Sequence, residues 1–161
     1  MSAAETQTRI WQGIEAAEPP IMRGDFAQLL KMAEGMLQSR RDRFPGEVSG
    51  GKLTADEAQR ELTAFEYLVA NWRFIATGQG EPAGHGADHV LRDALDEAIA
   101  RIAAFAGERG GFSETLGAQA QAVIALRWHL EPGRRTIALA RLNHLLRADA
   151  RAAITSREPA A

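Results

Sequence analysis

The chain has 161 residues, of which 45% are hydrophobic, and a formal net charge of −2. These values predict one globular domain with a sizeable core and no overall field that would attract nucleic acid. Cysteine is absent, which excludes disulfides, thiolate metal sites and cysteine nucleophiles. No apolar run reaches the length of a membrane span, and the first ten residues lack the pattern of a secretory signal, so we expect a cytoplasmic protein without a membrane partner.

The N-terminal arm is expected to hold one short helix. Residues 1–8 are predicted to be a flexible tail, and a helix is predicted from about Thr8 to Ala17. Pro19 and Pro20 would stop this helix, because proline lacks a backbone donor and restricts the residue before it. Trp11 would then anchor the arm to the main body.

The best-specified helix of the sequence runs from about residue 53 to 75. Thr54 and Glu57 have the spacing of a capping box at its start, and Gly78 follows its end. Its apolar side is formed by Ala58, Leu62, Phe65, Leu68, Val69, Trp72 and Ile75. A preceding helix is predicted from an Asp25 N-cap to about Arg43, ended by Pro45 and Gly46, and the two form an antiparallel hairpin over residues 25–76.

Three further helices are predicted in the C-terminal half. They cover about residues 88–106, 113–130 and 132–154, and we expect them to form a bundle (88–154) against which the hairpin packs. The middle helix carries few polar residues and should be central. The predicted fold is therefore an all-α domain of five or six helices over residues 9–154, followed by a flexible tail at 155–161.

A second side of the 53–75 helix carries Tyr67 and Phe74, seven residues apart. Because these two large side chains lie opposite the apolar stripe, another part of the fold covers them or a partner binds there. They are the predicted protein-binding residues, and self-association into a homo-oligomer through such a patch is one expectation.

The C-terminal region is basic. Residues 127–157 contain seven arginines against Glu131 and Asp149, a local balance of +5 that leaves −7 for the remainder. On the last helix Leu139, Leu142, Leu145 and Leu146 share one side, and the other side is lined by Arg134, Arg141, Arg147 and Arg151. This arginine face predicts either a nucleic-acid-binding surface or the solvated outer face of an amphipathic helix.

Catalytic and metal-binding patterns are weak in this sequence. His85, Asp88 and His89 form the only tight group of metal-ligand types, but His85 precedes the expected helix start and no further ligand is implied. No nucleophile elbow or phosphate-binding loop occurs, and adjacent acidic pairs on a helix point in different directions. We therefore expect a protein that is not an enzyme and has no cofactor or metal.

Residues 40–72 resemble a pattern found in small prophage-encoded helical proteins of bacteria. The shared elements are Arg40-Arg41, Phe44-Pro45, Gly50-Gly51, Leu53-Thr54, Glu57-Ala58 and Trp72. The resemblance implies a phage or mobile-element setting, and no functional residue follows from it. The predicted function is a protein-protein interaction module, an adaptor or regulator; the alternative is a nucleic-acid-binding protein of the phage packaging or repressor type.

Overall fold

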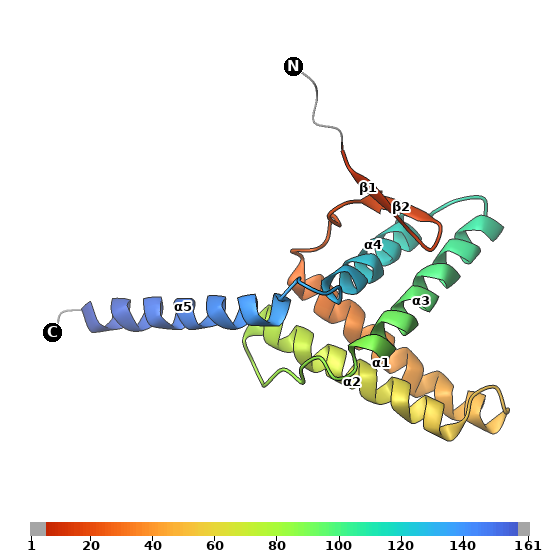
Figure 1. Ribbon diagram of the computed structural model, residues 1–161, viewed down its shortest axis with the longest axis horizontal. Coiled ribbons are helices and arrows are strands. Elements are labelled where there is room, and N and C mark those ends of the chain that lie inside the picture. The colour runs from red at the N-terminus through yellow and green to blue at the C-terminus, as the bar shows by residue number, and fades with distance from the viewer. Residues whose placement is uncertain (1–5, 158–161) are drawn as a thin grey trace, which may run out of the picture.

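The computed structural model describes residues 6–157, without the side chain of Arg157, and confirms the all-α class. Within these residues the chain forms five helices and one small hairpin (Figure 1). The elements are β1 Thr8–Trp11, β2 Ile14–Ala17, α1 Phe26–Ser49, α2 Ala55–Thr77, α3 Asp88–Glu108, α4 Glu114–His129 and α5 Thr136–Arg157. No helix in this described part is long and apolar enough to cross a membrane. Of the predicted tails, residues 1–5 and 158–161 lie outside the described residues.

The helix predicted over residues 8–17 is wrong, because this segment is a β-hairpin. β1 and β2 pair antiparallel with Trp11 opposite Ile14. The two residues between them, Gln12 and Gly13, have φ values of 50° and 92°, and positive φ at both positions defines the tight turn that suits the twist of a hairpin. Trp11 does anchor the arm as expected, since it is 4% exposed.

α1 and α2 form the predicted antiparallel hairpin, seen at the lower right of Figure 1. The capping box is confirmed: the Glu57 amide donates to Thr54 Oγ1 at 3.1 Å, and the Thr54 amide to the Glu57 carboxylate at 3.4 Å. The predicted end of α1 near Arg43 is wrong, because the helix continues through Pro45 to Ser49. Pro45 is exposed, so water can reach the carbonyl that loses its donor, and the continued helix keeps Phe44 buried.

α3 and α4 pack together across the hairpin, with α4 contacting α1 and α3 contacting α2. α4 is central as predicted, since every residue from Ala122 to Leu126 is buried. The Leu116 amide donates to the Ser113 hydroxyl at 3.0 Å, which caps the start of α4. The face of α3 that points inward includes Ile99, while Phe105 is 43% exposed.

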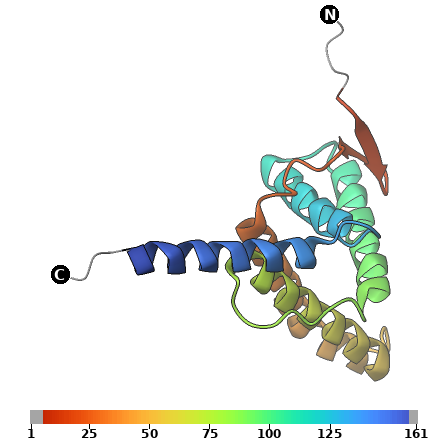
Figure 2. The ribbon, with the colours of Figure 1, turned by 60° about the vertical axis from the view of Figure 1, so that its left-hand side comes forward.

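α5 does not complete a C-terminal bundle with α3 and α4. Its main contact is with α2, and it then projects from the body as a single helix (Figures 1 and 2). The predicted start at Pro132 is also corrected: Pro132 and Gly133 lie in a loop, Arg135 has a φ of 56°, and α5 begins at Thr136.

Candidate functional site

The first turns of α5 are fastened to the C-terminal end of α2. His144 Nε2 lies 2.9 Å from the Phe74 carbonyl oxygen and 3.2 Å from that of Ile75. Because a carbonyl only accepts, Nε2 carries the proton and donates to these two carbonyls in the last turn of α2. The Phe74 carbonyl also accepts from the Gly78 amide at 2.8 Å. Gly78 allows this approach, since a Cβ at that position, where φ is +76°, would lie 3.2 Å from the His144 ring.

This attachment uses the side of α5 opposite the leucines, where Ile137 packs against the core. Ala140 is buried, the His144 ring meets the Phe74 ring edge-on at 5.3 Å, and the Arg141 guanidinium lies 5.0 Å from the centre of the Phe74 ring. An ordinary amphipathic helix would pack by its leucines and present its arginines to water. Here the orientation is reversed.

The consequence is an uncovered apolar surface, which we call the leucine face. It consists of Leu139, Leu142, Leu145, Leu146 and Ile154, each between 53% and 65% exposed. Every residue from Leu145 to Ser156 is exposed, so the second half of α5 is a lone helix in solvent. Monomeric proteins rarely expose aliphatic side chains in such a continuous row, and an isolated helix of this length is marginal in water.

The four arginines predicted to form one basic face are divided by the structure. Arg134 lies in the loop before α5, where it stacks 3.8 Å over the Trp128 ring and donates to the Trp128 carbonyl at 3.2 Å. Arg141 lies on Phe74 and 3.8 Å from Glu81. Arg147 and Arg151 are exposed and reach no acidic side chain among residues 6–157. Of the four, this last pair, one turn apart, is exposed without such contacts, while the Arg141 side chain is 50% exposed.

Tyr67 and Phe74 do not form the exposed patch expected from the sequence. Phe74 is 6% exposed because the first turns of α5 cover it. Tyr67 is half-buried and lines a shallow hollow beside His89 at the start of α3. The second side of α2 is therefore covered in part by the chain's own last helix, and the apolar surface left over lies on α5.

The histidine and aspartate group at the start of α3 does not converge. His85 Nδ1 pairs with Asp88 Oδ2 at 2.9 Å, whereas His89 Nε2 lies 3.1 Å from an Arg60 nitrogen. Within the described residues no three histidine, aspartate or glutamate side chains are placed to hold a metal ion.

A cleft of 320 Å³ lies between α2, α3 and the end of α4, and its lining includes Trp72 and Ile75. Several of its polar side chains form hydrogen bonds that hold the fold together. Asn71 exchanges two hydrogen bonds with the Gly84 backbone, at 2.9 and 3.0 Å, and thereby holds the loop between α2 and α3. Burial lowers the pKa of His129; its Nε2–H donates to the Arg23 carbonyl and its Nδ1 accepts from Thr136, both at 2.7 Å. His129 is thus a neutral structural link without a free nitrogen for catalysis.

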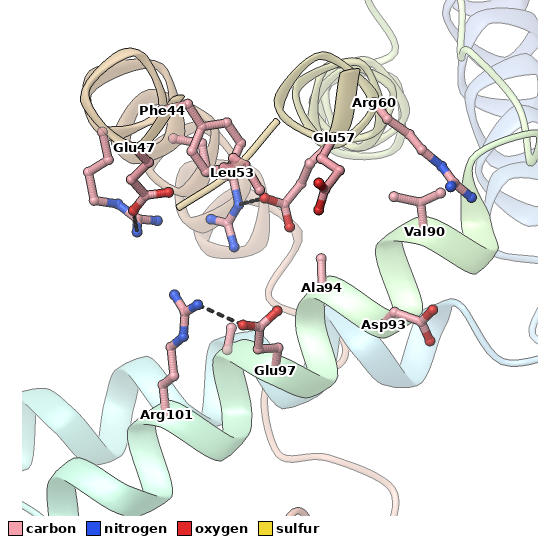
Figure 3. Close-up of a pocket in the computed structure, with 14 residues that line it drawn as sticks. Phe44, Glu47, Leu53, Glu57, Arg60, Val90, Asp93, Ala94, Glu97 and Arg101 are labelled. Atoms are coloured by element: carbon pink, nitrogen blue, oxygen red, sulfur yellow. Dashed lines mark hydrogen bonds and ion pairs between the residues drawn. The ribbon is translucent and has the colours of Figure 1, made fainter. Parts of the chain in front are cut away.

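A second cleft, of 340 Å³, is charged and separates the far end of the α1–α2 hairpin from α3. Figure 3 shows Glu47 and Glu57 on the hairpin side and Glu97 and Arg101 on α3. Three arginines that line the cleft form ion pairs with glutamates. The nitrogen–oxygen distances are 3.6 Å in Arg40–Glu61, 3.4 Å in Arg43–Glu47 and 2.6 Å in Arg101–Glu97. Most of the charge in this cleft is thus paired within the chain, while Asp93 on α3 is exposed at its edge.

Arg40 and Glu61 form the buried pair at the edge of this cleft. The Arg40 guanidinium stacks 3.9 Å over the Phe65 ring and donates to the Met36 carbonyl at 3.1 Å. Burial lowers the pKa of Arg40 and raises the pKa of Glu61, and in each case the partner's charge opposes the effect. The sequence held a signal for this residue, because Arg40 lies in helical register with Leu29, Ala33 and Leu37.

Comparisons of the chain with protein-family models, with curated proteins and with solved structures found no match. The choice among these surfaces therefore depends on their chemistry. The two clefts hold charges and hydrogen bonds that are largely satisfied within the chain, whereas the side chains of the leucine face are more than half exposed to water.

Proposed function

We propose that this protein is a non-enzymatic protein-binding module whose docking element is the leucine face of α5. The single observation that supports it is the reversed orientation of α5, which turns five aliphatic side chains outward. Burying a fully exposed aliphatic side chain contributes about 1.5–3 kcal/mol, so five half-exposed ones supply roughly 4–8 kcal/mol. That range is comparable with the lower part of the cost of bringing two proteins together, about 4–15 kcal/mol.

The way α5 is attached favours docking through this face. The His144 and Phe74 contacts hold the first turns of the helix against α2, so the leucines have a fixed direction before a partner arrives. A docking element that is already ordered loses less conformational entropy on binding than a segment that must fold.

Nucleic-acid binding is the second candidate, and its support is narrower. Arg147 and Arg151 are exposed on the projecting helix, but Arg134 and Arg141 are engaged with Trp128 and Phe74. Two phosphate contacts predict weak binding with a modest salt dependence, roughly tenfold between 50 and 200 mM salt. A fluorescence anisotropy titration with duplex DNA at two salt concentrations tests this candidate, and absence of binding at low salt rejects it.

Photo-crosslinking in the native cell tests the docking function. A benzophenone amino acid replaces Leu142 in one variant and Ala148 in another; Ala148 is exposed on the other side of α5. Protein adducts at position 142, and few at position 148, are expected. Equal adduct formation at the two positions, or none at position 142, contradicts the proposal.

A further inference from the structure

The apolar stripe along α5 has the same spacing when it is read from either end. Its successive members are separated by 3, 4, 4 and 3 residues: Leu139, Leu142, Leu146, Ala150 and Ala153. Separations of three and four residues keep side chains on one side of a helix. A second α5 running in the opposite direction therefore places its stripe residues at the same levels along the helix axis.

Side-chain size alternates correctly in that arrangement. With the midpoint at Leu146, Leu142 lies at the level of Ala150 of the second copy, and Leu139 at the level of Ala153 of the second copy. We propose that the leucine face binds α5 of a second copy of this chain as an antiparallel pair, with a two-fold axis beside Leu146. This inference rests on the docking function proposed above, and it names the partner.

A parallel pair would match the residues poorly. It would place leucine on leucine through the first half of α5 and alanine on alanine through the second half, so the two helices could not keep one separation along their length. In the antiparallel pair large residues face small ones on both sides of the Leu146 midpoint, where two leucines meet, and this allows the close packing found in protein interiors. The two-fold pair is also closed, since the same surface is used on both chains.

The arginines of α5 lie away from this contact, and Asp149, about 60° from Leu146 around the helix axis, lies at its edge. Arg147 and Arg151 project at least 80° from Leu139 and Leu146 around the helix axis, at about 100° per residue. Arg141 is held at the α2 side by Phe74 and Glu81. The arginines of the two copies therefore lie behind the contact, where water screens their repulsion.

The contact lies at the lower limit of a specific interface. At roughly 100 Å² for each half-exposed leucine, Leu139, Leu142 and Leu146 of the two copies supply about 600 Å², whereas specific interfaces begin at about 1,000 Å². Leu145 and Ile154 lie at the edges of the contact and can add to this area. The exposed alanines of the stripe add to this area. No rearrangement of the body is needed, because Leu139 and Leu142 are already more than half exposed.

Disulfide mapping tests the pairing directly, since the chain has no cysteine of its own. Three single-cysteine variants are oxidised separately under mild conditions: Leu146→Cys, Leu142→Cys and Ala150→Cys. A mixture of the Leu142→Cys and Ala150→Cys variants is oxidised as well. In the antiparallel pair the two thiols of the Leu146→Cys variant face each other, whereas those of the Leu142→Cys variant lie about 12 Å apart along the axis, beyond the reach of a disulfide. We expect a disulfide-linked homodimer of the Leu146→Cys variant and a mixed dimer of the Leu142→Cys and Ala150→Cys variants. Homodimers of Leu142→Cys and of Ala150→Cys should each be at least about fivefold less abundant than these two products.

Two results would overturn the inference. Efficient homodimers of Leu142→Cys and of Ala150→Cys would indicate a parallel pair. A mass of one chain for the unmodified protein in solution, at up to hundreds of micromolar, would exclude a second copy. If the protein has the mass of one chain, crosslinks from the photoreactive residue at position 142 to a different protein would still support the docking function. The absence of such crosslinks would reject both proposals.

Discussion

Replacing Arg40 by methionine should destabilise the protein in a way that depends on pH. Arg40 is 7% exposed, and its guanidinium lies between the Phe65 ring and the Glu61 carboxylate. Methionine keeps part of the contact with Phe65 but leaves Glu61 without its cation. Breaking a buried ion pair costs about 3–5 kcal/mol. Because the Glu61 side chain is 25% exposed, water offsets part of this cost, and we expect about 2–3 kcal/mol at pH 7.

The sign of the pH dependence follows from Glu61. Burial raises the pKa of this carboxyl in the folded protein above its ordinary value of 4.5, so the folded state binds the proton more tightly than the unfolded state. The contribution of Glu61 to the free energy of unfolding is therefore most favourable below pH 4.5, and it is lost as the pH rises through the pKa that Glu61 has in the folded protein. Loss of Arg40 raises that pKa further, so the penalty of Arg40→Met should be largest at neutral pH and should shrink towards pH 4, where Glu61 is protonated.

Urea unfolding followed by circular dichroism, at one protein concentration, measures the loss of stability in Arg40→Met and its dependence on pH. Arg40→Met with Glu61→Leu is the matched control, since it removes both charges together. A buried ion pair replaced by apolar residues is often neutral or stabilising, so the double variant should recover most of the loss at pH 7. A penalty for Arg40→Met below about 1 kcal/mol, or one of equal size at pH 4 and pH 7, would refute this reasoning.

Four further substitutions test how the other elements are held. His144→Ala should cost about 1–2 kcal/mol and speed amide exchange in the first turns of α5, because the hydrogen bonds from His144 to the last turn of α2 and the contact with the Phe74 ring are lost; unchanged exchange would contradict the attachment. Gly78→Ala should cost about 1–3 kcal/mol in urea unfolding, from a positive φ and contact with the His144 ring. Gly13→Ala should cost about 1 kcal/mol or more, because φ is 92° there, whereas Gln12→Asn should be neutral or stabilising in the same measurement.

The sequence predicts the helices of this fold and their ends better than it predicts which elements pack against one another. The capping box at Thr54, the end of α2 at Gly78 and the central position of α4 follow from local rules, and the structure has all three. The N-terminal hairpin is only weakly signalled, because Gln12-Gly13 has the glycine of a two-residue turn but lacks the Asn, Asp or Gly that such turns prefer before it. Ile10, Trp11 and Ile14 also fit helical spacing, and that coincidence favours the helix that the structure does not have.

The candidate site required the structure. Leu139, Leu142 and Leu146 predict an apolar side of α5 but do not specify what covers it. The His144 and Phe74 contacts decide the orientation, and they join residues 70 positions apart that no local pattern connects. The Arg40–Glu61 pair is similar: helical register places Arg40 on the buried side of α1, but only the packing of α2 brings its carboxylate partner.

The mass of the protein in solution, with and without the leucine face, tests the central claim most directly. Light scattering should give twice the chain mass of 17.5 kDa for the unmodified protein. With Leu142→Glu and Leu146→Glu together, the mass should fall to that of one chain, because four carboxylates would enter the apolar contact, and Ala148→Glu should leave the dimer intact. The same mass for all three proteins, whether one chain or two, would contradict the assignment of the leucine face as the surface that binds a second copy.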